Sequence, residues 1–474
     1  VIIGYTDFIG TQKSRTYLAE GRSSQRGLRA HRLPFPYALS LCGKTLSGRG
    51  ASLQGMRAEP FRGMPQGLTK RIQQLDRYFI RREFLLMLAL KNAKVITVAG
   101  TTYEKGTILV DAGKIRAVGK NVRIPQGCEV MDLTGKWVTP GFIDAHTHIS
   151  TFNEPTTLPS IVDGNEKTDP VTAQVRGIDA LNPFDMAIEA SRRAGFSTCY
   201  TGPGSANVCG GIGVGFKTKQ GSTVYDIALP GTEHMKFAMG ENPKRVYGLE
   251  QHKMPMTRMG LAAVMRKVLY EALDYSDELR LGEKDLAKKP KRNFLLDELV
   301  PVVRGTRKCR IHAHRADDIV TAVRIAEEFH LDFSIEHCTE GYKILDFLKE
   351  HRVDCVVGPL TMGPSKMEIW GRRLTTPAQF EAAGINFCLT QDTSSGTKYL
   401  PVYVGMCIAR GLSEKTAFEA VTIRPARLLG LADRIGSIEV GKDADLAVWS
   451  GNPFSNLTLC EKTIIDGEVY DNLA

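Results

Sequence analysis

One short stretch organises the chain: Val138-Thr139-Pro140-Gly141-Phe142-Ile143-Asp144-Ala145-His146-Thr147-His148-Ile149. It predicts an apolar strand that ends in two histidines one residue apart. Residues i and i+2 of a strand point to the same face, so His146 and His148 can direct their rings at one point. Converging neutral imidazoles favour a divalent-metal half-site. Two solvated histidines at the end of a strand are the alternative.

Size and composition indicate a large folded protein. The chain has 474 residues, of which 42% are hydrophobic, enough for a large core. Its ten cysteines form no CxxC pair or regular framework, which predicts reduced thiols and a cytoplasmic location. No apolar run approaches the roughly 20 residues that span a bilayer, so we expect no membrane partner.

The basic charge belongs to the first part of the sequence. Residues 1–86 contain 15 basic and five acidic residues, which accounts for the whole net charge of +10. The remainder is balanced, so we expect no nucleic-acid partner. Residues 1–86 lack periodic patterning and are predicted to be a disordered or non-native extension, with Met87 as the natural start. A twin-arginine export signal at Arg81-Arg82 and a functional basic arm are the alternatives.

Two β-rich segments flank the middle of the chain. Residues 87–139 show short strand patterns separated by glycine turns. Residues 432–474 show the same pattern. We predict that the two segments pair into one small composite β-sandwich domain.

The middle of the chain, residues 140–431, alternates short apolar runs with helical patterns. This alternation predicts βα units and a parallel sheet. Eight strands with their helices fit a TIM (β/α)8 barrel, in which chemistry lies at the carboxyl ends of the strands. The predicted strands are Phe142–Ala145, Ser197–Thr201, Gly213–Lys217, Met235–Met239, Lys308–Ile311, Asp332–Ile335, Val353–Val357 and Asn386–Leu389.

The stretch from Pro140 to His148 resembles the first metal-binding strand of the amidohydrolase superfamily, PGFIDxHxH. The resemblance extends over about 380 residues and is closest to the imidazolonepropionase-like branch of metal-dependent hydrolases. It implies a hydrolase that cleaves a C–N bond with one or two divalent ions, expected to be zinc. A mononuclear deaminase, a cyclic-amide hydrolase and a non-enzymatic barrel are the alternatives.

The resemblance also implies a ligand set. Lys236 aligns with a fourth-strand lysine that is carbamylated and bridges two metals in many members. There are two alternatives. One is a plain ion pair between Lys236 and a carboxylate, and the other is that Lys217 is the residue equivalent to the family's lysine. His314 is expected to be a second-shell or substrate-facing catalytic residue. The ligands implied in two-metal form are His146, His148 and Asp392 for one ion, and His312 and His337 for the other.

A divalent ion lowers the pKa of water to about 7, and Asp392 is expected to carry the proton to the leaving nitrogen. A one-metal form would use His146, His148, His312 and Asp392. The partner is a small-molecule substrate, and a homo-oligomer is left open. Cations at Lys217, Lys219, Arg258 and Lys398 are candidates for binding a substrate carboxylate.

Overall fold

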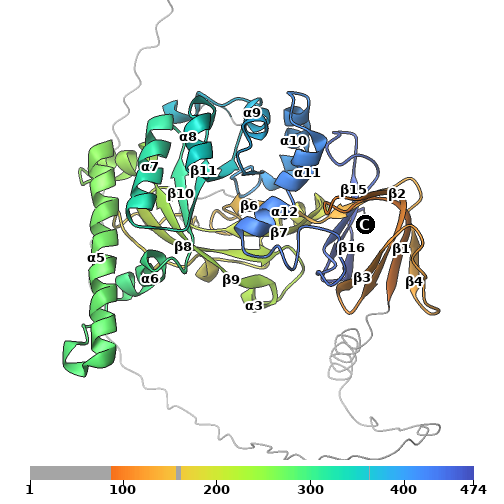
Figure 1. Cartoon of the computed structure of the whole chain (residues 1–474), viewed down its shortest axis with the longest axis horizontal. Helices are drawn as coiled ribbons and strands as arrows, with labels where there is room; N and C mark the ends of the chain where they lie inside the picture. Colours follow the sequence, from red (N-terminus) through yellow and green to blue (C-terminus); the bar gives the residue numbers. More distant parts are fainter. Residues whose placement is uncertain (1–86, 156–161, 362, 364, 474) are drawn as a thin grey trace, which may run out of the picture. The chain divides into compact units, whose positions relative to one another are not determined.

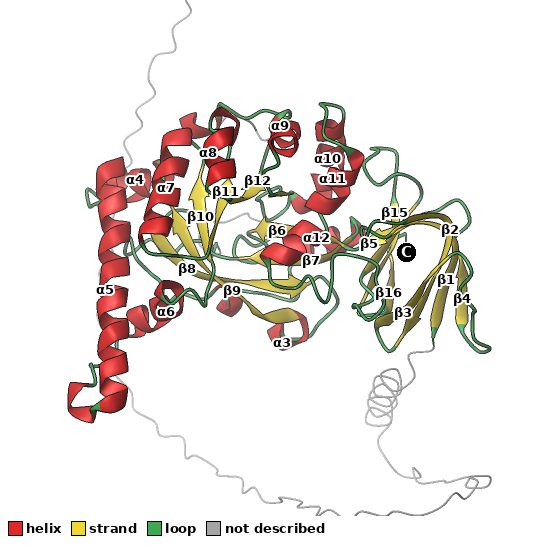
Figure 2. Ribbon diagram, in the orientation of Figure 1, coloured by secondary structure: helices red, strands yellow, loops and turns green. Residues whose placement is uncertain are grey.

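A computed structural model of the protein describes residues 87–155, 162–361, 363 and 365–473 (Figure 1). The predictions for residues 1–86 therefore lie outside the described residues. The described chain forms two eight-stranded sheets, with the helices grouped around the second one (Figure 2). Within this described part, no helix is long and apolar enough to cross a membrane.

The first sheet joins the two flanking segments. β5 (Trp137–Pro140) pairs antiparallel with β14 (Leu446–Trp449), with Val138 opposite Val448. The strand order is β16-β15-β14-β5-β1-β2-β3, and β4 pairs with β1, so the expected pairing of the two β-rich ends is confirmed. The other strands are β1 (Leu88–Ile96), β2 (Thr102–Asp111), β3 (Lys114–Gly119), β4 (Glu129–Asp132), β15 (Cys460–Ile465) and β16 (Glu468–Asp471).

The second sheet is a nearly closed barrel whose strands follow chain order from β6 to β13. All eight predicted strands are present, which confirms the barrel. Closure between the first and last strands is helped by Thr390, whose hydroxyl lies 2.6 Å from both Asp144 Oδ1 and the His146 carbonyl. The strands are β6 (Phe142–Thr147), β7 (Phe196–Thr201), β8 (Cys209–Lys217), β9 (Ala228–Ala238), β10 (Cys309–Ala313), β11 (Phe333–His337), β12 (Asp354–Val357) and β13 (Phe387–Leu389).

One strand corrects the expected parallel order. β8 runs antiparallel to both β7 and β9. A parallel connection needs a crossover of a dozen or more residues, whereas residues 202–208 and 218–227 are too few for one. Lys217 at the carboxyl end of β8 therefore pairs with Thr198 near the start of β7. This reversal places Lys217 at the end of the barrel opposite to the carboxyl ends of the other strands.

The helices agree with the sequence pattern except near the end of the barrel. The helical sequence pattern of residues 416–429 is divided in the structure into α11 (Glu414–Ala420) and α12 (Ile423–Leu428). Pro425 lies in the first turn of α12, where its missing N–H is tolerated, although it could not continue α11. The others are α2 (Met186–Arg193), α3 (Val224–Ile227), α4 (Glu241–Lys244), α5 (Arg258–Lys284), α6 (Phe294–Val303), α7 (Ala316–Glu328), α8 (Leu345–Glu350), α9 (Thr376–Ala383) and α10 (Leu400–Ile408).

Candidate metal centre

Histidines from three strands meet at the carboxyl end of the barrel. His146 on β6 and His148 just beyond it place their Nε2 atoms 3.2 and 3.3 Å from Oδ1 of Asp392, which follows β13. His337, the last residue of β11, has its Nδ1 3.8 Å from Asp392 Oδ2. His146, His337 and Asp392 each offer one ligand atom, and these atoms lie within 4.8 Å of one another. The structure thus brings these predicted site residues together.

A second group shares one of these histidines. His312 and His314, both on or beside β10, join His337 in a set whose ligand atoms also lie within 4.8 Å of one another. The ring centroids of His312 and His337 are 4.3 Å apart, and His314 stacks on His337 at 4.6 Å. Neither ring nitrogen of His312 has a hydrogen-bond partner. His337 therefore connects two candidate ligand groups into one centre.

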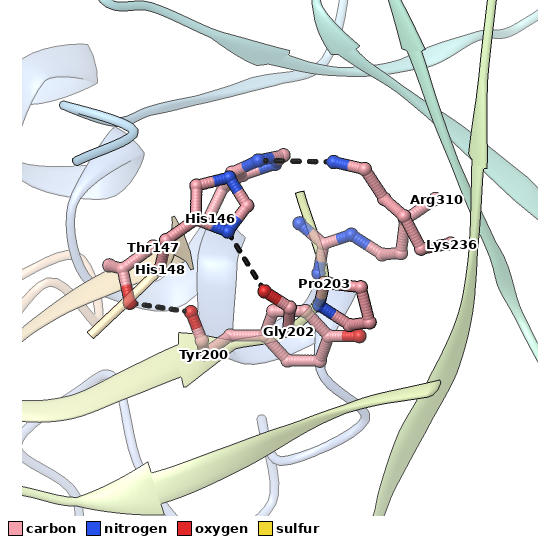
Figure 3. A pocket seen from close by; sticks show the side chains of 8 residues that line it. All are labelled: His146, Thr147, His148, Tyr200, Gly202, Pro203, Lys236 and Arg310. Atoms are coloured by element: carbon pink, nitrogen blue, oxygen red, sulfur yellow. Dashed lines mark hydrogen bonds between the residues drawn. The ribbon is translucent and has the colours of Figure 1, made fainter. Parts of the chain in front are cut away.

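Hydrogen bonds at Nδ1 orient three of the rings. His146 Nδ1 lies 2.5 Å from Glu336, His148 Nδ1 lies 2.8 Å from the Gly202 carbonyl (Figure 3), and His337 Nδ1 lies 2.8 Å from the Gly358 carbonyl. A neutral imidazole that donates from Nδ1 carries a lone pair on Nε2.

Two such lone pairs, on His146 and His148, face the Asp392 carboxylate, whose Oδ1 has no hydrogen-bond donor, and the lone pair on His146 also faces Lys236 Nζ at 3.4 Å. Three electron-rich atoms directed at one point repel one another unless a cation lies between them. The residues present therefore fit a divalent ion.

The electrostatics of the site agree with this fit. Burial lowers the pKa of His148, His312 and His314, and it lowers the pKa of His337 to about 3, which keeps these rings neutral. Burial alone would raise the pKa of Asp392, but His337, His146 and His148 together bring it well below its usual range. Neutral imidazole and ionised carboxylate are the forms that bind metals.

Lys236 enters the same space from β9. Its side chain is buried, and its Nζ lies 3.4 Å from His146 Nε2 (Figure 3). No carboxylate of the described residues lies within ion-pair distance of it, so the plain ion pair considered from sequence is not present. Burial lowers its pKa to about 8.

Lys217, the alternative to Lys236, lies elsewhere. Its Nζ contacts Asp445 at 2.8 Å and Asp466 at 2.7 Å, both from the segment after the barrel. The other cations suggested for substrate binding are also held by acidic side chains of this chain. Their partners are Asp466 for Lys219, Asp318 for Arg258 and, at 3.9 Å, Glu154 for Lys398.

Sequence reasoning missed a buried charged pair beneath the histidines. Arg310 donates to both carboxylate oxygens of Glu336, at 3.0 and 2.7 Å, and Glu336 in turn contacts His146. Burial opposes ionisation of Glu336, but Arg310 and His146 hold its pKa well below the usual range. Arg310 precedes His312 by two residues on one strand face, so the same two-residue period that identified the histidines could have identified it.

A further buried carboxylate, Glu368, comes from the segment after β12. Its Oε1 lies 3.8 Å from Nε2 of both His312 and His314. It occupies a single 3-10 turn, Met367–Ile369, that carries no periodic pattern. No sequence pattern indicates that this turn lies beside the histidines of β10.

A barrel with histidines and a carboxylate converging at its strand ends defines a class of barrel hydrolases. The chain belongs to the amidohydrolase family. An amidohydrolase crystal structure from Thermotoga maritima is 39% identical, covers 81% of this chain and 100% of its own, and has a TM-score of 0.77. A model of the amidohydrolase family also matches residues 310–470.

Two curated relatives agree with this family. Amidohydrolase tasK of Hapsidospora irregularis is 25% identical over 410 residues, covering 78% of this chain but only 40% of that protein. An imidazolonepropionase of Maricaulis maris is 25% identical over 371 residues, covering 73% of this chain and 87% of the relative. The protein is a hydrolase that acts on C–N bonds.

Proposed function

We propose that this protein hydrolyses an amide-type C–N bond with divalent ions, expected to be zinc, held at the histidine cluster. The convergence of His146, His148 and Asp392 carries the proposal, since their electron-rich atoms face one another at 3.2 and 3.3 Å in a buried site. Amides, cyclic amides, N-acyl amino acids and dipeptides are the substrate classes considered.

The proposed centre holds two ions. His146, His148 and Asp392 would hold one, and His312 and His337 would hold the other. When bound, such ions supply Lewis acidity that lowers the pKa of water and polarises the scissile carbonyl.

Lys236, as a carbamate, would be a further ligand of this centre. A lysine with its pKa lowered to about 8 is partly neutral at physiological pH. The neutral amine attacks carbon dioxide, an N–C bond forms and a proton is released. The carbamate supplies two oxygens in place of a buried ammonium, which is costly without an acidic partner.

The other site residues orient groups and move protons. Asp392 accepts a proton from the attacking water and passes it to the leaving nitrogen, which departs as a neutral amine. His314, stacked on His337, faces the substrate. The Arg310–Glu336 pair fixes the ring of His146 through its Nδ1.

A mononuclear hydrolase or deaminase of the imidazolonepropionase type is the second candidate. It is favoured by the relative from Maricaulis maris, which matches over most of its own length. In this form His146, His148, His312 and Asp392 hold one ion. His337 then orients the substrate, and Lys236 stays unmodified.

The test is hydrolysis by the full chain after chelation and after reconstitution with zinc, manganese or cobalt. The panel contains N-acyl amino acids, dipeptides, lactams and imidazolone-type cyclic amides. Ions should restore activity in the wild type but not in His146→Asn, while His351→Asn, a partly exposed histidine paired with Glu327, should behave as wild type. A folded chain that binds none of these ions would overturn the proposal.

A further inference from the structure

Glu368 has a position that the proposed mechanism does not use. It is 2% exposed, yet it lies in a loop turn beyond the seventh barrel strand. Its Oε2 accepts the Glu241 N–H at 2.8 Å, and its Oε1 accepts a hydrogen bond from Lys366 at 2.6 Å. The carboxylate is fixed against Gly240, where a Cβ would come within 2.6 Å of Oε2. The turn is therefore held in place against the chain that follows β9.

This anchoring directs one carboxylate oxygen at two histidines. Oε1 lies 3.8 Å from Nε2 of His312 and 3.8 Å from Nε2 of His314. These separations are too long for hydrogen bonds. A carboxylate oxygen retains an acceptor site after one hydrogen bond from Lys366.

Each of the two carboxylate–imidazole separations is close to that of two ligands on one ion. Two donors bound at about 2.0–2.2 Å in tetrahedral geometry lie roughly 3.3–3.6 Å apart, so only a small inward shift is needed. His312 is 3% exposed, and both of its ring nitrogens lack a hydrogen-bond partner. His314 is held through Nδ1, which lies 2.7 Å from the Thr339 hydroxyl, leaving Nε2 directed at the same space. The group thus combines a fixed carboxylate with an unpartnered buried imidazole.

We infer that Glu368 and His314 are ligands of the ion bound by His312. This inference rests on the proposed function, assigns His314 to the ion instead of the substrate, and adds two ligands to the second ion of that centre. With His312 and His337 they give three imidazoles and one carboxylate, a donor set that suits zinc, manganese or cobalt. The segment after β12 then contributes directly to the centre, in addition to the strand ends.

The first test uses cobalt as the probe, with the full chain and the Glu368→Gln variant. Glutamine keeps the shape of the side chain but is a much weaker ligand. Glu340→Gln is a matched control. Glu340 also accepts two hydrogen bonds, one from the Ala316 N–H at 3.1 Å and one from the Lys343 ammonium at 2.6 Å. Bound cobalt is counted after desalting, and its visible absorption spectrum is recorded.

Glu368→Gln should retain one cobalt ion fewer than the wild type and lose the corresponding absorption, while Glu340→Gln should match the wild type. An unchanged count with an unchanged spectrum in Glu368→Gln would overturn the inference and leave the proposed function intact. A wild type that binds no cobalt would overturn both.

A second test needs no variant. In crystals of the wild type soaked with zinc, an anomalous peak should lie about 2.0–2.2 Å from Glu368 Oε1. Peaks confined to the His146, His148 and Asp392 side would overturn the inference, and this readout remains valid if Glu368→Gln fails to fold.

Discussion

Lys217 and Lys236 lie on neighbouring strands of one barrel and are both buried, with 2% and 5% of their surface exposed. Lys217 contacts three aspartates of the segment after the barrel, Asp443, Asp445 and Asp466. Burial works against its charge, but these aspartates raise its pKa above the ordinary value. Burial lowers the pKa of Lys236 to about 8, because Glu336 and Asp392 raise it only in part and neither forms an ion pair with it.

Burial alone therefore does not identify a functional lysine. The residues that contact each lysine distinguish its role, and the direction of its strand determines which residues these are. Because β8 runs antiparallel, its terminal lysine meets the aspartates of the flanking segment, whereas Lys236 on β9 lies among the histidines. Lys217 is therefore interpreted as a structural ion pair and Lys236 as a residue available for chemistry.

The largest expected effect is on activity, in Lys236→Met. We expect kcat/KM to fall by about 10³-fold or more, roughly 4 kcal/mol of barrier, because the proposed carbamate ligand is lost. The melting temperature should stay equal or rise, since methionine removes a buried amine without an acidic partner. Steady-state kinetics and thermal unfolding check both. Activity within about tenfold of wild type would contradict the role of Lys236.

Lys217→Met should show the opposite pattern. We expect the free energy of unfolding to fall by about 3–5 kcal/mol, because buried aspartates lose their cation. The kcat of the folded fraction should not change. Denaturant titration combined with kinetics at low temperature measures the two quantities. A variant as stable as wild type would show that the aspartates do not depend on Lys217.

Glu336→Gln tests the contact that orients His146 in the site around Lys236. Loss of the carboxylate that contacts His146 Nδ1 should weaken metal affinity by about 10–100-fold. Competition with a chelator dye measures this affinity. Lys217→Met is the control, because it disturbs a buried charge at the other end of the barrel and should leave metal affinity unchanged.

The smallest expected effect concerns pH and Asp466. Burial opposes its ionisation, but Lys217 and Lys219 lower its folded pKa to about 2, below the unfolded value of about 3.9. Its stabilisation is therefore present above pH 4 and is lost as the pH falls towards 2.

Because the Asp466 side chain is 37% exposed, we expect Asp466→Asn to be less stable than wild type by only about 1 kcal/mol at pH 7. Unfolding titrations of both proteins between pH 7 and pH 2 should show this difference shrinking. A difference that grows on acidification would contradict the assigned ion pair.

Much of the fold could be predicted from the sequence because each barrel strand is a short apolar run between helical patterns. The direction of β8 was missed, since an apolar run has no direction and the evidence lay in the short connections on either side of it. The break between α11 and α12 was missed although Pro425 marked it.

The candidate site was predictable where ligands share a strand. His146 with His148, and His312 with His314, follow the two-residue period of a strand. Glu368 was not predictable, because its place beside β10 depends on contacts of a loop turn with residues more than a hundred positions away, such as Glu241. The Arg310–Glu336 pair carried the same strand period and was overlooked.

Lys236 and the surrounding histidines are proposed to form a metal centre. Its most direct test is the intact mass and metal content of the full chain under non-denaturing conditions with bicarbonate. We expect two metal ions and the added mass of one carbon dioxide, with the added mass absent from Lys236→Met. A folded chain that carries no metal and no added mass, even when supplied with zinc and manganese, would contradict it.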